Sequence, residues 1–207
     1  YSDVVKLDND IDKIINYILK GNSIICIPNE KQYIVCNTVK IAKRNVNTPE
    51  IQNTIKGPRD SFTENIQTNL SLIRYRIKDS SLQVKKLSIG KRSNTSVAVI
   101  YIDDIVNPKL IKKVEKELKN RVIDGVFESG YIQKLLEKNK KRLFPDIGTI
   151  ERSDTAATSL MKGKICILVE GSNLALVIPR IFFDFLDAGD DHYDNIFICI
   201  TNKLIRF

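Results

Sequence analysis

The first part of the chain has apolar residues at helical spacing, followed by two short apolar runs. Five residues share one helix face: Ile11, Ile14, Ile15, Ile18 and Leu19. Gly21 follows as a typical helix stop. Residues 24–27 and 33–36 are apolar runs on either side of a polar turn, which is the pattern of a β-hairpin. We therefore predict a helix followed by a hairpin.

A second amphipathic helix is predicted to begin near Ser61. Residues 61–64 match a capping box, in which the side chains of Ser61 and Glu64 satisfy free backbone N–H groups at the helix start. The apolar face would consist of Phe62, Ile66, Leu70, Ile73 and Ile77. Residues 82–89 alternate weakly, as in an edge strand, and residues 97–102 are continuously apolar, as in a buried central strand.

The remaining residues predict more helices and a second hairpin. Asn107-Pro108 is a helix start with a capping residue and a proline at the first helical position. The other expected elements are a helix at about 129–138, a helix from Ser153 or Asp154 to Gly163, strands at 164–169 and 174–178, and a helix from about 191. A polar, irregular stretch from Lys43 to Thr54 is predicted to be a linker.

The chain contains one internal similarity. The helix–glycine–hairpin unit at 12–36 matches the unit at 154–178 at a constant offset. About a hundred residues precede the second unit, and almost none precede the first. We expect residues 1–54 to be the tail of a first module plus a linker, and residues 55–207 to be a second module. The predicted fold class is α/β (mixed α+β), with two small modules that each have a mixed β-sheet flanked by helices, the first module being incomplete.

Composition and charge exclude several classes of protein. Hydrophobic residues make up 43% and charged residues 28% of the 207 residues, which is typical of a globular chain. No run approaches the roughly 20 apolar residues of a membrane-spanning helix. The net charge is +8, but the lysines at 109–121 and 134–142 fall on polar helix faces, and no motif for nucleic acid accompanies them. We expect no nucleic-acid partner.

The residues that usually carry catalysis or bind metals are scarce. The four cysteines lie singly in apolar runs, which is typical of buried thiols in a reducing compartment. His192 is the one histidine. The pairs Asp103-Asp104 and Asp190-Asp191 stand beside predicted helix starts, where carboxylates stabilise the helix dipole. We predict a non-catalytic domain with no cofactor and no metal.

A series of short motifs from Gly57 to Tyr193 carries a family resemblance. It begins with residues 57–64 (GPRDSFTE), continues with 68–77 (TNLSLIRYRI), and includes Gly90, Ser129-Gly130-Tyr131-Ile132, Glu151-Arg152, Gly163-Lys164, Val169-Glu170-Gly171, Pro179 and Phe182-Phe183. In order and spacing these motifs resemble the A-subunit family of spore germinant receptors, the GerA type. The resemblance covers about two thirds of the chain; Ser153 and Tyr75 depart from the family pattern, and residues 1–50 match only in general.

The resemblance implies a place and a set of partners. Such A subunits have a soluble N-terminal region of two α/β subdomains followed by a membrane-embedded part, and they lie in the inner membrane of the dormant spore. They work with a transporter-like B subunit and a lipoprotein C subunit, sense nutrients and trigger germination. The resemblance places this domain on the cytoplasmic (core) side, and its end at Phe207 suits a cut before the first membrane helix.

Candidate ligand-binding residues cluster near two predicted helix starts. They are Arg59, Glu64, Asn69, Arg74, Glu151, Arg152 and Asp154. One interpretation is structural, with Arg59 in an ion pair and residues 151–154 forming a helix start with an acidic first turn. The other is a site between the modules for a carboxylate such as that of an amino acid. Arg74 and Arg76 lie on different helix faces, so at most one can face a given cleft.

Three functions remain open after these observations. The first is a regulatory, signal-relaying domain whose two modules change their relative angle. The second is an assembly scaffold that docks the partner subunits through a surface such as the helix at 109–121. The third is a direct binder of a small, amino-acid-like germinant held between the modules.

Overall fold

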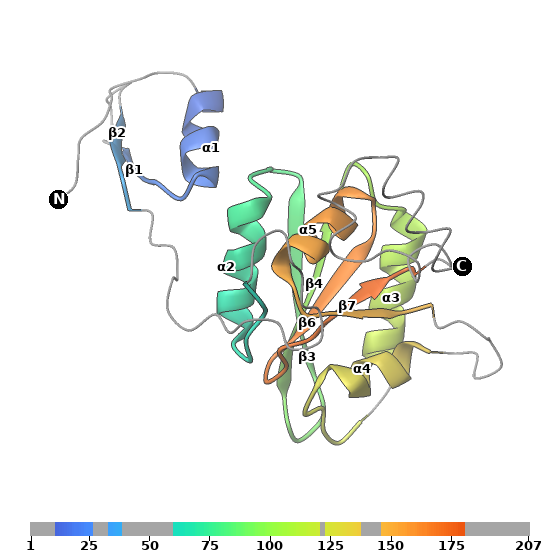
Figure 1. Ribbon diagram of the computed structural model, residues 1–207. Coiled ribbons are helices and arrows are strands. Elements are labelled where there is room, and N and C mark those ends of the chain that lie inside the picture. The colour runs from blue at the N-terminus through green and yellow to red at the C-terminus, as the bar shows by residue number, and fades with distance from the viewer. Residues whose placement is uncertain (1–10, 27–32, 39–59, 121–122, 138–145, 181–207) are drawn as a thin grey trace.

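The computed structural model describes residues 11–26, 33–38, 60–120, 123–137 and 146–180. They form a small helix–hairpin unit and a larger module built on a five-stranded sheet (Figure 1). The predicted boundary between residues 54 and 55, the expected linker at Lys43–Thr54, Arg59 and the elements expected after residue 180 lie outside the described residues.

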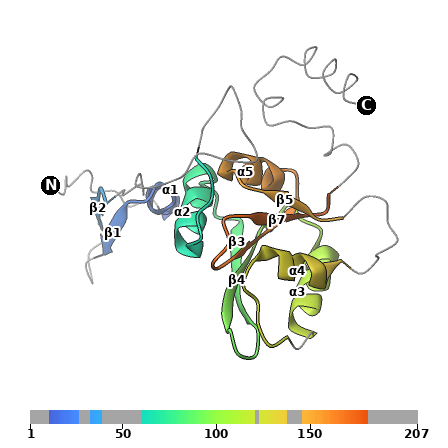
Figure 2. The ribbon, with the colours of Figure 1, turned by 60° about the horizontal axis from the view of Figure 1, so that its bottom comes forward.

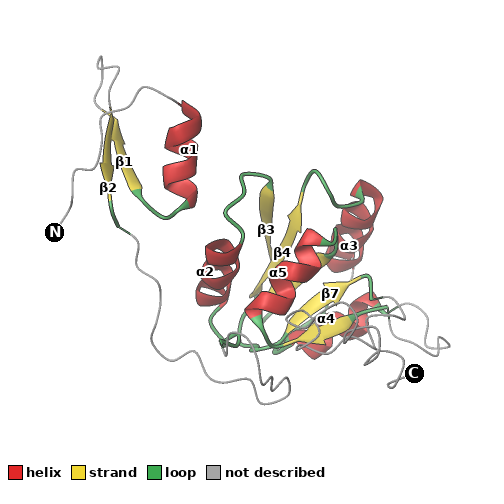
Figure 3. Cartoon of the chain, turned by 45° about the horizontal axis from the view of Figure 1, so that its top comes forward, coloured by secondary structure: helices red, strands yellow, loops and turns green. Residues whose placement is uncertain are grey.

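The small unit has the predicted order of helix, glycine and hairpin. Helix α1 spans Ile11–Leu19 and is followed by Gly21, whose φ of 88° is a left-handed conformation that glycine adopts without strain. Strands β1 (Ser23–Cys26) and β2 (Tyr33–Cys36) pair antiparallel. Helix α1 lies between its hairpin and the larger module in the views of Figures 1 and 3.

The larger module contains a sheet with the strand order β3-β4-β6-β7-β5. The strands are β3 (Leu82–Ile89), β4 (Thr95–Ile102), β5 (Gly148–Ile150), β6 (Ile165–Val169) and β7 (Ala175–Ile178). Strand β4 is buried from Val97 to Ile102 and lies inside the sheet, whereas β3 is a half-exposed edge strand. Both predictions for these strands are confirmed.

Helices cover the two faces of this sheet (Figure 2). Helices α2 (Ile66–Arg76) and α5 (Ser153–Met161) pack on the face that contains Ala98, Ile100 and Ile102 of β4. Helices α3 (Pro108–Asn120) and α4 (Ser129–Leu136) pack on the opposite face, against Val97, Val99 and Tyr101. The continuous apolar run of β4 thus reflects burial on both sides.

The fold class is confirmed as mixed α and β with helices flanking sheets, but its sheet is not mixed in strand direction. Every strand pair in the described residues is antiparallel. An apolar run shows that a strand is buried but not which way it runs, because direction depends on the connections. Strand β5 was not predicted, because three residues are too short for a periodic signal.

The predicted capping box is wrong. Helix α2 begins at Ile66, and its N-cap is Asn65, whose Oδ1 accepts hydrogen bonds from the backbone N–H groups of Gln67 and Thr68. Ser61 instead forms a β-bridge with Arg152. The capping-box pattern describes local bonds only, and here tertiary contacts hold residues 61–64 outside the helix. The predicted apolar positions nevertheless are all buried: Phe62, Ile66, Leu70, Ile73 and Ile77.

Candidate functional site

The start of the larger module is fastened by an ion pair between Asp60 and Arg76. Nη2 of Arg76 lies 2.6 Å from both carboxylate oxygens of Asp60, and Nε donates to Oγ of Ser153 at 2.7 Å. The Ser153 hydroxyl also donates to Asp60. The three side chains come from the segment before α2, the end of α2 and the start of α5, so one cluster joins all three.

A second set of contacts lies beside this cluster. The backbone N–H of Phe62 donates to the Glu151 carbonyl at 2.7 Å, and Ser61 bridges Arg152. The Arg152 side chain is 1% exposed and donates to Asp154 through Nε at 3.0 Å and Nη2 at 2.6 Å. A buried guanidinium needs such a partner, because an unpaired buried charge is strongly destabilising. We call the residues Asp60, Ser61, Arg76, Arg152, Ser153 and Asp154 the α2–α5 junction.

Asn69 holds the segment before α2 in place from inside the helix. Its Oδ1 accepts from the Thr63 N–H at 2.8 Å, and its Nδ2 donates to the Thr63 carbonyl at 2.6 Å. The residue is fully buried. The exposed Glu64 contributes its carbonyl, which accepts from Gly171 N–H at 2.8 Å. These contacts give Asn69 a structural role, and the described contact of Glu64 uses its backbone.

The outer face of α2 lines a cleft toward the helix–hairpin unit. The cleft has a volume of about 550 Å³. Its lining includes Ile18, Lys20, Gly21 and Thr38 on one side, and Thr68, Ser71, Arg74, Tyr75, Lys78 and Asp79 on the other. Helix α2 therefore presents one face to the sheet and α5 and the other face to this cleft.

The charged groups of the cleft are mostly basic. Lys20, Arg74 and Lys78 line it together with one carboxylate, Asp79. Hydrogen bonds from the Ser81 backbone N–H and then from the Ser81 hydroxyl lower the pKa of Asp79. Nζ of Lys78 lies 5.4 Å from the Tyr75 ring centroid, a cation–π distance. The excess of positive charge favours an anionic occupant.

The predicted site residues fall into separate places. Glu151, Arg152 and Asp154 lie at or beside the α2–α5 junction, Asn69 is buried and bonds Thr63, and Arg74 lines the cleft. The prediction that Arg74 and Arg76 do not share a cleft is confirmed, because Arg76 bonds Asp60 and Ser153. Arg76 and Ser153 were not predicted as site residues. They contact Asp60 at sequence separations of 16 and 93 positions, and local spacing patterns do not reveal contacts between residues so far apart.

The described residues offer little for other chemistry. They contain no group of three or more His, Cys, Asp or Glu residues that could hold a metal ion. Burial raises the pKa of the Cys166 thiol to about 12, which leaves it unreactive as a nucleophile at neutral pH. None of their helices is long and apolar enough to cross a membrane.

Comparisons with known proteins agree on one family. The family model described as Bacillus/Clostridium GerA spore germination protein matches residues 1–207. Spore germination protein KA of Bacillus subtilis (strain 168) is 34% identical over 202 residues, which are 98% of this chain and 37% of that protein. Spore germination protein GerLA of Bacillus cereus is 38% identical over 194 residues, which are 94% of this chain and 39% of that protein.

A solved structure is also similar. It is the crystal structure of the N-terminal domain of the A subunit of the Bacillus megaterium spore germinant receptor GerK3. The TM-score is 0.63 at 29% identity, covering 86% of this chain and 63% of that chain. The chain thus spans 37% and 39% of the two curated relatives and about two thirds of the solved domain.

Proposed function

Because this chain belongs to the Bacillus/Clostridium GerA family of spore germination proteins, we propose that it relays a signal within a germinant receptor A subunit. In this proposal a nutrient signal changes the position of the helix–hairpin unit relative to the larger module and helps to trigger germination. The partners are a transporter-like B subunit and a lipoprotein C subunit. The receptor lies in the inner membrane of the spore, with this domain on the core side.

The two-faced contact of helix α2 carries the proposal. Ile66, Leu70 and Ile73 on one face are buried against the sheet and α5. Ser71, Arg74 and Tyr75 on the other face line the cleft toward α1. A shift of the helix–hairpin unit therefore acts first on α2. Coupling by a packed helix that has two discrete positions is an established way in which domains transmit a change.

The α2–α5 junction makes the larger module a suitable receiver of such a shift. Arg76 at the end of α2 bonds Ser153 at the start of α5, and Asp60 contacts both. Movement of α2 is thereby shared with α5, which itself packs on β4, β6 and β7. A change at the cleft can reach the sheet through bonded side chains rather than through a loop.

Filling the cleft in the intact receptor tests this function. We expect Ser71→Trp to slow or abolish nutrient-triggered germination of spores, because a large ring in the cleft changes how the helix–hairpin unit sits on α2. The matched control is Gln67→Trp, an exposed position of the same helix outside the cleft lining. Receptor amounts are compared by immunoblot. Unchanged germination of Ser71→Trp spores with normal receptor amounts would contradict the proposal.

The charge of the cleft favours a second candidate, direct binding of an amino-acid-like germinant. Lys20, Arg74 and Lys78 could hold a carboxylate, and the Tyr75 ring could cover an apolar group. The test is an NMR titration of the protein with a panel of free amino acids and sugars. Chemical-shift changes at the Arg74 and Tyr75 amides with millimolar ligand would favour this candidate if they disappear in Arg74→Ala. A panel of ligands that causes no chemical-shift changes would reject it.

A further inference from the structure

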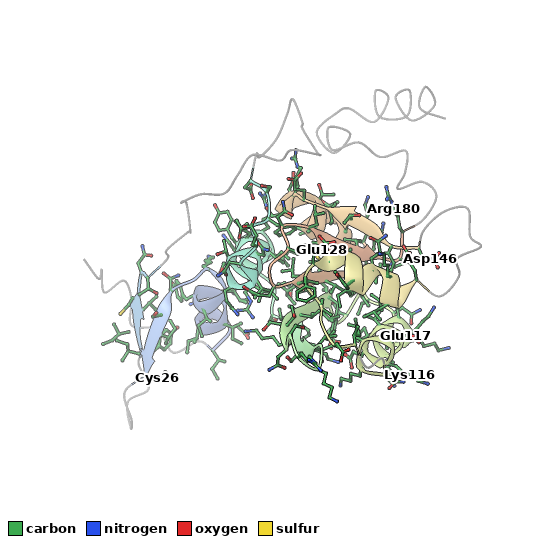
Figure 4. The ribbon with its side chains drawn as sticks, turned by 90° about the horizontal axis from the view of Figure 1, so that it is seen from below. Cys26, Lys116, Glu117, Glu128, Asp146 and Arg180 are labelled. Atoms are coloured by element: carbon green, nitrogen blue, oxygen red, sulfur yellow. The ribbon has the colours of Figure 1, made fainter. Side chains whose placement is uncertain are left out.

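The exposed face of helix α3 carries a stripe of lysines. Its members are Lys109, Lys112, Lys113, Lys116 and Lys119, and all five are exposed. At 3.6 residues per turn they fall within an arc of about 120°, on the side of the helix opposite its buried stripe. Figure 4 shows Lys116 on the outside of the molecule. We call these five residues the basic face of α3.

The two glutamates of α3 leave this face positive. By helix spacing, Glu115 and Glu117 lie at the two borders of the arc and not within it. Glu115 also accepts a hydrogen bond at 2.6 Å from Nζ of Lys85 on strand β3, so its charge is paired at the edge of the sheet. The basic face of α3 therefore presents one sign of charge along about three turns of helix.

An apolar hollow lies at the C-terminal end of the basic face. It has a volume of about 350 Å³ and is lined by residues of β3, the turn after β3, the end of α3 and the segment that follows α3. Its apolar lining consists of Leu87, Ile89, Leu118 and Ile123. Two exposed lysines, Lys91 and Lys119, also line it. The hollow thus combines hydrocarbon side chains with two cations, and it shares Lys119 with the basic face of α3.

We propose that the basic face of α3 and this hollow bind the surface of a membrane that contains anionic phospholipids. The lysines attract the phosphate headgroups, and the hollow takes the hydrocarbon part of one lipid next to its headgroup. The apolar stripe of α3 is buried in the module, so the helix lies on the membrane and does not insert into it. This contact rests on the membrane placement of the receptor in the proposed function, but it does not require the signal relay.

Two features favour a lipid surface over a nucleic acid or an acidic protein. Every cation of the basic face is a lysine, a flexible point charge that suits a diffuse layer of headgroups, whereas fixed bidentate recognition favours arginine. Helix α3 also contains no aromatic residue on which a base could stack. The second feature is the hollow, because an apolar lining beside two lysines matches a molecule that is anionic at one end and hydrocarbon at the other.

Binding of the 207-residue chain to lipid vesicles tests the proposal. One set of vesicles contains equal parts of phosphatidylglycerol and phosphatidylcholine, and the other contains phosphatidylcholine alone. We expect the chain to sediment with the anionic vesicles at about 0.1 M salt, where the Debye length is about 10 Å, and to be released as the salt concentration rises. It should not sediment with the neutral vesicles. Vesicle binding needs neither germinant nor partner subunits, so its failure leaves the signal relay untouched.

A triple variant links the binding to the basic face. Each lysine close to an anionic bilayer increases partitioning about fivefold, so replacement of Lys112, Lys113 and Lys116 by Gln should weaken binding roughly 100-fold. The matched control replaces three exposed lysines of other elements by Gln, which changes the net charge equally. They are Lys13 on α1, Lys86 on β3 and Lys162 after α5. The control should stay within about threefold of the unchanged chain, because its lysines lie outside the basic face. Circular dichroism checks that both variants are folded.

A short-chain lipid tests the hollow separately. We expect dihexanoyl phosphatidylglycerol, at concentrations where it is monomeric, to change the NMR chemical shifts of the Lys119 and Ile123 amides. Dihexanoyl phosphatidylcholine should change them less, because its headgroup has no net charge. Glycerol 3-phosphate supplies the anion without the hydrocarbon. If it changes these shifts as much as the short-chain phosphatidylglycerol does, the hollow binds a free anion and not a lipid.

The full-length protein in lipid nanodiscs gives a second reading. Acetylation of Lys112 and Lys116 by an amine reagent, scored by peptide mass spectrometry, should be severalfold slower in nanodiscs with phosphatidylglycerol than in nanodiscs of phosphatidylcholine alone. Lys86, an exposed lysine outside the basic face, is the internal reference and should react equally in both.

Three results would overturn the proposal. The first is no binding to anionic vesicles at low salt, or equal binding to anionic and neutral vesicles. The second is an equal loss of binding in the two triple variants, since net charge alone would then explain the attraction. The third is protection of Lys112 and Lys116 that appears only when other receptor subunits are added, since the basic face of α3 would then bind a protein and not the membrane.

Discussion

Arg76 contacts both carboxylate oxygens of Asp60 through a single nitrogen, Nη2, at 2.6 Å each, and the two residues are 16 positions apart. The side chains are 20% and 25% exposed, so the pair is largely shielded from water. The same guanidinium bonds Ser153, which starts α5. Because three segments meet at Arg76, its removal leaves the Asp60 carboxylate without its cation and the Ser153 oxygen without its guanidinium donor, with only the Ser153–Asp60 hydrogen bond remaining.

Replacement of Arg76 should destabilise the larger module. We expect Arg76→Ala to lower the free energy of unfolding by about 1–3 kcal/mol, the range for a partly buried charged hydrogen-bonded group. The matched control is Arg74→Ala on the same helix, which is exposed and should change stability by less than about 0.5 kcal/mol. Urea unfolding followed by circular dichroism gives both values. If Arg76→Ala lowers the free energy of unfolding no more than Arg74→Ala does, the junction contributes no stability.

Asn69 should prove to be a structural residue rather than a ligand-binding one. Asn69→Asp replaces the Nδ2 donor with an oxygen, which would face the Thr63 carbonyl at the present distance of 2.6 Å. We expect a loss of about 1–3 kcal/mol in unfolding free energy, because a buried acceptor is left unpaired. Gln67→Glu, an exposed amide-to-acid change two positions earlier, serves as the control. If Asn69→Asp is as stable as the control, the assigned role is wrong.

The sequence predicted buried positions better than it predicted the ends of elements. The apolar periodicity of Phe62, Ile66 and Leu70 gave their burial correctly, since all three lie in one core cluster. The helix start was placed too early because Ser61 and Glu64 fit a local capping pattern. A bridge from Ser61 to Arg152 and a bond from Phe62 to Glu151 decide the actual conformation, and neither can be read from nearby residues.

The candidate site was predictable only in part for the same reason. Arg74 and Asp154 stand in motifs near helix ends and were identified from them. The cleft is formed by residues of α1 and α2, and its lining includes Lys20 and Lys78. Those two lysines are far apart in the sequence, so no local spacing pattern indicates that they line the same cleft.

The thiol of Cys166 should remain unreactive up to alkaline pH. Burial raises its pKa to about 12 from the usual value of 9.0, so the folded chain keeps this thiol protonated where an unfolded chain ionises it. Stability should therefore fall as pH rises through 9.0 toward 12. Peptide-resolved thiol labelling of the 207-residue chain at pH 9 should modify the exposed Cys26 and spare Cys166 until urea unfolds the chain. Rapid modification of Cys166 in the native protein would contradict its burial.

The basic face of α3 allows the assembly-scaffold function to be tested separately. Lys112, Lys113 and Lys116 are exposed on this helix, and Figure 4 shows Lys116 at its surface. If the domain docks partner subunits here, replacement of all three by Glu should reduce co-purification of the other subunits while leaving the unfolding midpoint unchanged.

The control for that variant reverses charge elsewhere on the same module. Replacement of Lys86, Lys91 and Arg92 by Glu changes the net charge equally at exposed positions on and after β3. Loss of assembly in both variants would indicate a general charge effect. Normal assembly in the α3 variant would remove this surface from consideration as a docking site.

The central claim is that the helix–hairpin unit and the larger module change their relative position when the receptor is activated. The most direct test is a spin-label distance measurement in the complete receptor, with one label at Asn16 on α1 and the other at Gln83 on β3, both exposed positions. A control pair at Gln83 and Lys112 lies within the larger module. We predict that germinant shifts the Asn16–Gln83 distance distribution and leaves the Gln83–Lys112 distribution unchanged. Identical Asn16–Gln83 distributions with and without germinant, in a receptor that still responds, would contradict the claim.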